Sequence, residues 1–380
     1  MESKSLSHRN SSIELLKVFA IILIVISHVV QTLGSSFDFL PFNSYVLNFS
    51  AATTDPKILI LALLRHSGAW GNTIFFICSA WFFIDEDKVN YRKMLNMLLD
   101  VWFVSVIIFI IVSAFGNLNL SWKDALHQFL PNFYSNNWYI TCYVLFYLFH
   151  DKLNLIIESL NQRRHFRVAS IMAILYIAIN FIQGGHFASS ELIVWMTIYF
   201  CIAYMKKYMA DLSNNIKFNI YFAIIMFACH IGLVCFTNLL GLRLSFFEKY
   251  LLHWNGNNNP FLILATVGML NIARNTQFES KTINYISKLS LLIYITTENL
   301  LLRQYYRPRM WQYVYDNFGY THILFWVLIL VIIVFVFGLL SSIVYHHTIQ
   351  KIVSKISEKL YGVIKSIWIK LEDTVVNNLK

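Results

Sequence analysis

Charged residues are scarce in this chain. Its 380 residues include 20 acidic and 30 basic side chains, so that 13% are charged while 57% are hydrophobic. A typical soluble domain carries about 25% charged residues, so this composition excludes an ordinary soluble protein. Glycine and proline are also sparse, with 13 and 5 residues, and no internal repeat is visible. This argues against transporter folds built from repeated, Gly- or Pro-broken helices.

Cysteine is infrequent, and its positions indicate neither a disulfide framework nor a metal site. The five cysteines are Cys78, Cys142, Cys201, Cys229 and Cys235. Their number is odd, all fall within apolar runs, and none has the spacing of metal ligands. We therefore expect them to be packing residues.

Motifs of familiar soluble enzymes are also missing. The chain has no phosphate-binding Gly-Lys-Ser loop, no Gly-x-Ser-x-Gly elbow and no His-Glu-x-x-His pair. These motifs accompany nucleotide hydrolysis, serine hydrolase chemistry and zinc proteolysis. A functional site must therefore be sought among residues inside the membrane.

Long apolar runs are what the chain has in abundance. The sequence predicts an all-α polytopic transmembrane bundle of about ten spans. The runs cover residues 12–33, 58–84, 95–116, 138–156, 168–184, 190–205, 217–240, 259–273, 283–302 and 321–345. The first run resembles a signal peptide, but it holds Glu14 and Lys17 and lacks a small-residue cleavage site. We expect it to be retained.

Basic residues are distributed unevenly between the two sides of these spans. With the N-terminus in the cytoplasm, the inner segments collect most of the 30 lysines and arginines, which is the pattern of the positive-inside rule. Both termini are therefore predicted to be cytoplasmic, and the net charge of +10 requires no nucleic-acid partner. Residues 241–258 and 303–320 are expected as outer loops, with Arg307 and Arg309 on a solvated surface.

The chain is predicted to have two parts, a membrane domain over residues 1–345 and a cytoplasmic tail over residues 346–380. The tail has apolar residues at helical spacing and lysines outside most of that stripe. The apolar positions include Ile349, Ile352, Val353, Ile356, Leu360, Val363 and Ile364. This pattern predicts a basic amphipathic helix on the anionic inner leaflet, with binding to a partner helix as the alternative.

The first apolar run contains three ionisable residues, Glu14, Lys17 and His28. At helical spacing they lie within roughly 60° of one face, and His28 is about 16 Å further along the axis than Lys17. Ionisable groups inside a membrane are costly and indicate a functional site. The alternatives are a hydrogen-bonded packing role for His28 and snorkelling of Lys17 to the inner surface.

The other apolar runs contribute further polar residues. Arg65, Asn72 and Ser79 recur every seven residues and share a helix face, which suits a hydrogen-bonded channel lining or contacts between helices. Trp138 stands at the start of its run, where an aromatic belt is the alternative explanation. Tyr294 and Glu298 occupy the ninth run, and Glu298 lies close enough to its outer end to be merely solvated.

Taken in order, these segments resemble the acyltransferase 3 family of integral membrane acyltransferases. That family opens with an acidic residue, a basic residue three positions later, and a histidine after ten intervening positions. Glu14, Lys17 and His28 have this spacing, although relatives usually carry arginine at the place of Lys17. The resemblance continues through four later segments: Phe75-Phe76 with Ser79-Ala80, Arg92-Lys93, Trp138-Tyr139, and Tyr294 to Arg303.

Three departures from the family pattern are visible besides Lys17. Ala80 replaces a glycine, the basic motif at Arg92-Lys93 lacks its second arginine, and Thr297 stands where relatives have histidine. If that histidine is essential to the family's chemistry, this chain is inactive or works differently. A membrane sensor that retains the fold without catalysis is therefore one alternative.

The resemblance implies transfer of an acyl group, commonly acetyl, from acyl-coenzyme A to a hydroxyl of a bacterial surface polysaccharide or its lipid-linked precursor. Such an enzyme would lie in the bacterial plasma membrane, with acetyl-coenzyme A as a donor substrate and neither a permanent cofactor nor a metal. Its oligomeric state is not predicted. A transporter or flippase of a lipid-linked saccharide is the alternative from another class.

The site residues follow from the resemblance together with the charge pattern. Histidine has an ordinary pKa near 6.5, which suits a general base near neutral pH, and His28 is predicted as that base or as an acyl carrier. The full prediction assigns catalysis to His28, Glu14 and Lys17, acyl-coenzyme A binding to Lys17, Arg92 and Lys93, and the acceptor channel to Arg65, Asn72, Ser79, Trp138, Tyr294 and Glu298.

Overall fold

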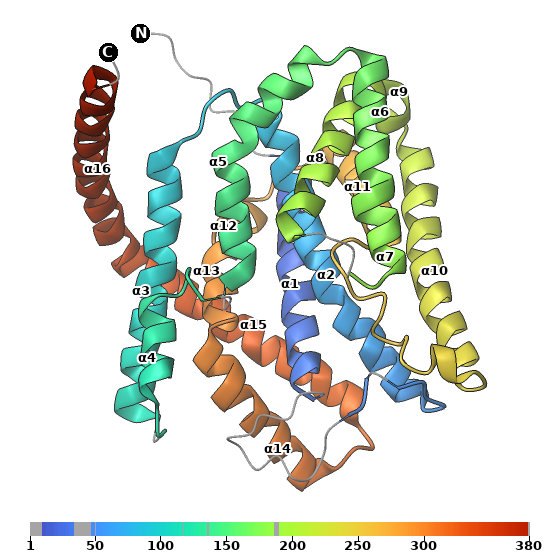
Figure 1. The fold of residues 1–380 in the computed structure, drawn as a ribbon. Coiled ribbons are helices and arrows are strands. Elements are labelled where there is room, and N and C mark those ends of the chain that lie inside the picture. Colours follow the sequence, from blue (N-terminus) through green and yellow to red (C-terminus); the bar gives the residue numbers. More distant parts are fainter. Residues whose placement is uncertain are drawn as a thin grey trace.

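The computed structural model describes residues 10–33, 47–49, 51–116, 118–134, 137–185 and 190–378. All regular structure in these ranges is helical, as predicted (Figure 1). The helices are α1 (Ser11–Leu33), α2 (Pro56–Phe83), α3 (Tyr91–Phe115), α4 (Trp122–Phe129), α5 (Trp138–Ser159), α6 (Gln162–Met172), α7 (Asn180–Ile182), α8 (Glu191–Tyr208), α9 (Ala210–Asn214), α10 (Ile216–Gly241), α11 (Pro260–Asn275), α12 (Lys281–Lys288), α13 (Ser290–Thr297), α14 (Arg307–Phe318), α15 (Ile323–Thr348) and α16 (Gln350–Asn378). Two π-helical segments, η2 (Ala173–Ile179) and η4 (Leu302–Tyr306), and one 3-10 helix, η3 (Ser245–Phe247), are also present in these ranges.

Six helical segments of the described chain are long and apolar enough to cross a bilayer. They are α1, α3, α5, the continuous stretch Gln162–Ile182, α10 and α15. The protein is therefore an integral membrane protein. The four remaining apolar runs are also helical, but α8 has 18 residues, α11 has 16, and α2 carries polar residues in its middle.

The ninth apolar run, residues 283–302, is not one helix, contrary to the prediction. It is divided between α12 and α13 at Leu289, and its end is separated from α13 by Glu298 and Asn299. Residues 303–320, expected as an outer loop, instead form most of η4 and the helix α14. Helical structure thus continues where hydropathy indicates a loop, and it breaks where hydropathy indicates continuity.

Helix α1 lies within the bundle and contacts α2, α11, α12, α13, α14 and α15. We call the end where α1, α3, α6 and α10 begin the proximal end, at the top of Figure 1, and the opposite end the distal end. Glu14 lies near the proximal end of α1 and His28 near its distal end. The polar stripe of this helix is thus covered by protein rather than by lipid, as its charges require.

The crossing of α1 and α2 depends on small residues. Ser67 Oγ on α2 donates to the carbonyl oxygen of Leu23 at 2.8 Å, and Ser27 Oγ on α1 donates to the carbonyl oxygen of Arg65 at 2.6 Å. A β-carbon at Gly71 would lie 2.6 Å from the carbonyl oxygen of Ala20. The close approach therefore requires glycine, as in other packed membrane helices.

Replacing Gly71 with alanine is expected to lower stability by about 1 to 3 kcal/mol, because the added methyl group would push against backbone atoms of α1. Gly232 on α10 is the matched control, since a β-carbon there would meet nothing within 4 Å. Thermal unfolding of both variants in the same detergent measures the effect. Equal stability of the two variants would contradict the close packing of α1 on α2.

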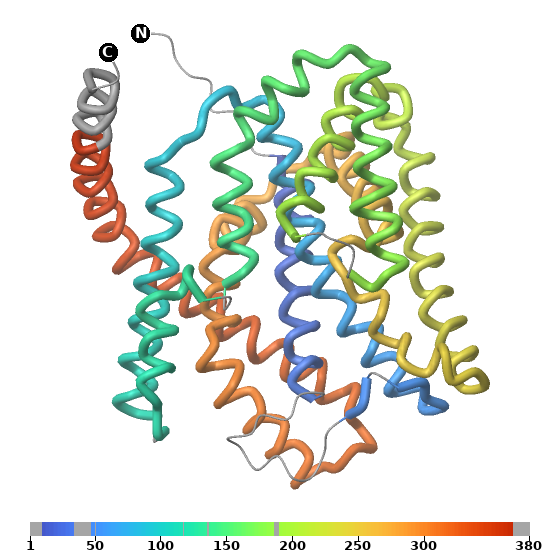
Figure 2. Tube along the Cα trace, viewed as in Figure 1, coloured from blue at the N-terminus to red at the C-terminus, as the bar shows by residue number. Residues whose placement is uncertain are grey.

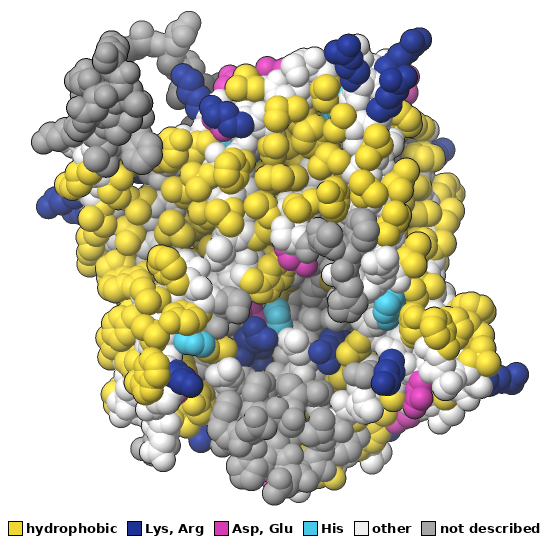
Figure 3. All heavy atoms as spheres, viewed as in Figure 1, with side chains coloured by type: hydrophobic (Ala, Val, Ile, Leu, Met, Phe, Trp, Pro, Cys, Tyr) yellow, Lys and Arg dark blue, Asp and Glu magenta, His cyan; other side chains and the backbone are white. Residues whose placement is uncertain are grey.

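The outer surface of the bundle is apolar. Large hydrophobic side chains are exposed along α10 and α15, among them Tyr221, Ile224, Phe236, Phe325, Leu328 and Leu340. Figure 3 shows hydrophobic side chains over much of the upper half of one face, with Lys and Arg side chains at its top and again in its lower half. Exposed apolar surface on this scale is the expected lipid contact of a membrane protein.

The tail helix α16 follows α15 directly and packs along the first part of α3, as Figure 2 also shows. Arg92 Nη2 lies 3.3 Å from Glu358 Oε2, and Gln350 Nε2 donates to Asp100 Oδ2 at 3.0 Å. These contacts tie the start of α16 to the membrane domain. The division at residue 345 and the placement of the tail on the inner leaflet stay predictions.

Candidate active site

His28 meets a buried carboxylate near the distal end of α1. Its Nδ1 atom lies 3.0 Å from Oε2 of Glu298, and the two side chains are 19% and 1% exposed. Glu298 comes directly after α13, at the point where the helix stops. The structure therefore brings together two predicted residues that are 270 positions apart in the chain.

Two arginines surround the same carboxylate. Arg307 Nη2 lies 3.1 Å from Glu298 Oε1, and Arg303 Nε lies 3.7 Å from Glu298 Oε2. Arg307 also donates to the carbonyl oxygen of Thr297. Its second terminal nitrogen, Nη1, is buried and has no hydrogen-bond partner among the described residues.

The placement of Arg307 corrects the sequence prediction. It was expected on a solvated surface but is 3% exposed, whereas Arg309 is exposed as predicted. The signal in the sequence was the spacing of Arg303 and Arg307, which are one helical turn apart and follow Glu298 closely. Charged side chains that are buried away from water are usually paired with an opposite charge, as Arg307 is with Glu298.

The break after α13 is what aims Glu298 toward α1. Asn299 accepts a hydrogen bond from the backbone N–H of Leu301 at 3.0 Å, and its Nδ2 donates to Gln128 Oε1 on α4 at 2.8 Å. The Asn299 side chain therefore starts the next helical segment and fixes the break against α4. Neither of these contacts was predicted from the sequence.

Thr297 occupies the position where relatives carry histidine, and its side chain serves packing. Its hydroxyl donates to the carbonyl oxygen of Ile293 at 2.9 Å, and its methyl group fills the space beside Gly338 on α15. A β-carbon at Gly338 would overlap that methyl group. The contact between His28 and Glu298 thus forms without a side chain from position 297.

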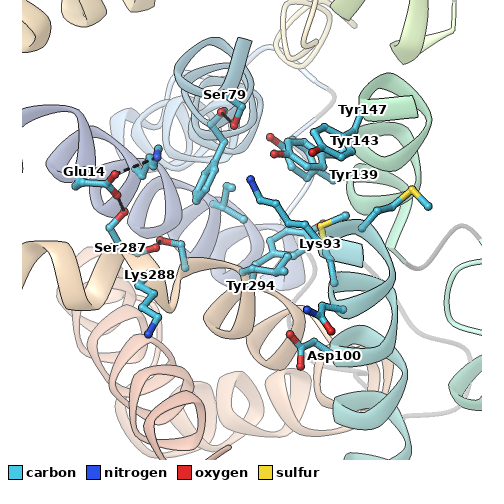
Figure 4. Close-up of a pocket in the computed structure, with 18 of the residues that line it drawn as sticks. Glu14, Ser79, Lys93, Asp100, Tyr139, Tyr143, Tyr147, Ser287, Lys288 and Tyr294 are labelled. Atoms are coloured by element: carbon cyan, nitrogen blue, oxygen red, sulfur yellow. Dashed lines mark hydrogen bonds and ion pairs between the residues drawn. The ribbon is translucent and has the colours of Figure 1, made fainter. Parts of the chain in front are cut away.

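A cavity of about 520 Å³ occupies the proximal half of the bundle. Figure 4 shows polar and aromatic side chains from α1, α3, α5, α12 and α13 around it. Its lining includes Glu14, Lys17, Ser79, Lys93, Asp100, Tyr139, Tyr143, Tyr147, Ser287, Lys288 and Tyr294. Three lysines therefore line one cavity, with Lys288 at its edge, where its Nζ lies 3.3 Å from Nε2 of His346. Tyrosines form much of the remaining wall.

The cavity reaches to within one helical turn of the His28 pair. Ile24 lines it four residues before His28 on α1, and Tyr294 lines it four residues before Glu298, which directly follows α13. Four residues of α-helix span about 6 Å. The far end of the lysine-lined cavity and the histidine–carboxylate pair are thus neighbours along both α1 and the α13 segment.

Glu14 and Lys17 belong to the proximal part of this cavity. Lys17 Nζ lies 3.3 Å from Glu14 Oε1, and Ser287 Oγ on α12 donates to Glu14 Oε2 (Figure 4). By the rise of an α-helix, they are about 16 to 21 Å from His28 along α1. The three residues of the first apolar run therefore lie at two separate places in the site.

The remaining predicted site residues lie in different parts of the structure and make different contacts. Lys93 and Ser79 line the cavity, whereas Arg92 pairs with Glu358 on the tail. Asn72 Nδ2 donates to Asn257 Oδ1 at 3.4 Å. The Arg65 guanidinium stacks on Phe49, and Trp138 packs edge-on against Tyr139. Of Arg65, Asn72 and Ser79, Ser79 lines the 520 Å³ cavity, and the assignment of all three to an acceptor channel stays a prediction.

Fold and site together define an integral membrane protein with a buried histidine–carboxylate pair next to a lysine-lined cavity. Residues 10–351 match the family model described as an acyltransferase domain. The chain belongs to the acyltransferase 3 family, which confirms the resemblance seen in its sequence and implies a membrane acyltransferase. No curated protein and no solved structure shows significant similarity to this chain.

Proposed function

We propose that this protein is an O-acyltransferase that moves an acyl group, in the first instance acetyl, from acyl-coenzyme A to a hydroxyl of a surface polysaccharide or its lipid-linked precursor. The observation that carries the proposal is the lysine-lined cavity that ends one helical turn from His28 and Glu298. An acyl donor held by its phosphates at the proximal end can extend its thioester toward the histidine. The distal end is left for the acceptor.

The proximal half of the cavity suits the donor. Lys17, Lys93 and Lys288 line it, and ammonium groups bind phosphate oxygens through charge-assisted hydrogen bonds. Acyl-coenzyme A is made in the cytoplasm, so the proximal end is assigned to the cytoplasmic side, in agreement with the basic residues of the inner segments. With ten spans, both termini then lie on that side.

The reaction centre supplies a base that is already oriented. Glu298 faces Nδ1 of His28, which leaves Nε2 to accept a proton from the acceptor hydroxyl. The hydroxyl oxygen attacks the thioester carbonyl carbon, the carbon–sulfur bond breaks, and the imidazolium returns the proton to the departing coenzyme A thiolate. The products are the acyl ester and coenzyme A, and His28 is neutral again.

Arg307 provides the second element of this chemistry. The attack places negative charge on the thioester oxygen, and buried cationic donors stabilise such charge most strongly where water is excluded. The free Nη1 of Arg307 is such a donor. Glu14 is assigned a positioning role, since it holds Lys17 and ties α1 to α12 through Ser287.

Replacing Lys93 with alanine tests the donor site. The KM for acetyl-coenzyme A is expected to rise about 10-fold, because a charge-assisted hydrogen bond contributes about 1.5 to 3 kcal/mol before screening. The kcat should change little, since the reacting atoms are not touched. Purified protein in detergent is assayed for transfer of labelled acetyl from acetyl-coenzyme A to de-O-acetylated surface polysaccharide.

Lys123 on α4, which stacks on Trp122, is the matched lysine outside the cavity. Its alanine variant should have the KM of the intact chain. An unchanged KM in the Lys93 variant, or an equal rise in both variants, would remove the donor from this cavity. Absence of acetyl transfer by the intact chain would contradict the proposed function itself.

A further inference from the structure

The segment that precedes α11 turns back into the bundle. The carbonyl oxygen of Leu251 lies 3.2 Å from Nε2 of His66 on α2, and Asn259 Nδ2 lies 3.0 Å from Nδ1 of His230 on α10. Both histidines are about 15 to 17 Å from the distal ends of their helices, given a rise of 1.5 Å per residue. The segment therefore reaches deep between α2 and α10 instead of lying outside them (Figure 1).

One side of this segment is fixed by a buried hydrogen-bond chain. Asn259 donates to His230, His230 lies 3.4 Å from His66, and His66 donates to the carbonyl oxygen of Leu251. A single set of neutral tautomers satisfies the whole chain. Trp254 Nε1 adds a hydrogen bond to Thr237 Oγ1 at 3.2 Å. These contacts hold non-helical backbone at membrane depth, where it must be covered by protein or face a water-filled cavity.

The other side of the segment faces a polar cavity of about 380 Å³. This size falls within the range of small-ligand sites. The lining consists of Asn180, Gly184, Gly185, Glu191, Val194, Leu252, His253, Asn255, Gly256 and Asn258. Amides, one carboxylate and one imidazole dominate it, and no lysine or arginine is among the described residues that line it. The chemistry favours a neutral, hydroxyl-rich ligand over a phosphate or another anion.

The cavity wall depends on glycine. Gly184 and Gly185 have φ values of +67° and +87°, which side chains rarely adopt. A β-carbon at Gly184 would lie 2.6 Å from the His253 ring, and one at Gly256 would overlap Oδ1 of Asn258. Glycine at these positions lets His253 and Asn258 occupy the wall, so the polar lining is a built feature of the fold.

Asn258 carries the argument for a ligand. Its residue is 6% exposed and lines the cavity, yet its Nδ2 has no hydrogen-bond partner among the described residues. A buried amide donor left unpaired costs about 1 to 3 kcal/mol. A hydroxyl oxygen of a bound sugar would satisfy it, and nearby Glu191 can accept from a second hydroxyl.

We infer that this cavity is a saccharide subsite, which holds a sugar residue of the acceptor chain other than the one that is acylated. The inference rests on the proposed function and adds a place for the acceptor. Asn257 connects the two regions, since it donates to Glu191 Oε2 at 3.0 Å and accepts from Asn72 on α2. The preceding residue of α2, Gly71, lies close to Ala20 and Ile24 of α1, so α2 contacts both the edge of this region and the helix that carries His28.

The test measures binding and kinetics with one polysaccharide probe, the de-O-acetylated surface polysaccharide from cells that lack this chain. Asn258→Leu removes the unpaired amide at similar volume, and Asn255→Trp fills the cavity from a half-buried position. Both variants should weaken polysaccharide binding at least 10-fold and raise the KM for polysaccharide equally, with the KM for acetyl-coenzyme A unchanged. Asn317→Leu on α14 is the matched control, because its amide is exposed and outside the cavity.

The outcomes separate the subsite from the proposed function. Acetyl transfer by both variants with the polysaccharide KM of the intact chain would overturn the subsite and leave the acyltransferase in place. Failure of the intact chain both to bind and to acetylate the polysaccharide would overturn both proposals. A loss in Asn258→Leu with normal binding in Asn255→Trp would also overturn the subsite, because a filled cavity cannot hold a sugar.

Discussion

Replacing His28 with glutamine is expected to lower kcat for acyl transfer by about 10²- to 10⁴-fold, the usual contribution of a general base. Glutamine keeps polar contact with Glu298 but cannot take a proton from the acceptor hydroxyl. The KM for acetyl-coenzyme A should stay within about 2-fold, because His28 does not line the lysine cavity. Steady-state kinetics of the purified proteins in detergent measure both constants.

His322→Gln is the matched control for this prediction, since His322 is exposed at the start of α15. That variant should turn over like the intact chain. A His28→Gln protein with kcat within a few-fold of the intact chain would show that another group removes the proton. A loss confined to the KM for acetyl-coenzyme A would instead place His28 in the donor site.

Replacing Glu298 with glutamine is expected to cost about 3 to 5 kcal/mol of stability and to abolish transfer. The stability loss arises because Arg307, which is 4% exposed at its side chain, would keep a buried charge without its carboxylate. The double variant Glu298→Gln/Arg307→Met removes both charges and should recover most of that stability. It should remain inactive, because His28 then has no carboxylate and the thioester oxygen has no cationic donor.

Thermal unfolding in one detergent gives the stability of each protein, and acetyl transfer gives its activity. Arg309→Met serves as the control, since Arg309 is exposed on the same helix as Arg307. Equal stability of the single and double variants would show that the Glu298–Arg307 pair is not held in a dry environment. Transfer by the double variant near the rate of the intact chain would remove the cluster from the chemistry.

The fold could be predicted from the sequence wherever hydrophobicity alone decides it. Helices α1, α3, α10 and α15 coincide closely with long apolar runs, because crossing a bilayer requires such runs. Hydropathy carries no information about a break within an apolar segment, so the division at Leu289 was missed. It also classed residues 241–258 as an outer loop, although the contacts of Leu251 with His66 and of Trp254 with Thr237 bring the second half of that segment into the bundle.

The site was predictable where a charge lies within an apolar run. His28, Lys17 and Glu14 stood out because ionisable residues inside a membrane are rare. The contact between Glu14 and Lys17 follows from their spacing of one helical turn. The partners from other segments were not predictable, since Glu298 follows α13 and Ser287 belongs to α12. Arg307 was placed on the surface because it falls outside every apolar run, yet the fold buries it against Glu298.

We propose that an acyl group passes from one side of the membrane to the other through the site of His28 and Glu298. Proteoliposomes in which the protein has a single orientation test this proposal. They are selected by whether α16 is accessible from outside the vesicle. Labelled acetyl-coenzyme A is placed on the tail side and de-O-acetylated polysaccharide on the other side. We expect labelled polysaccharide with the intact chain, almost none with His28→Gln, and none when the donor is moved to the polysaccharide side. Transfer that requires both substrates on one side, or polysaccharide movement without acylation, would contradict it.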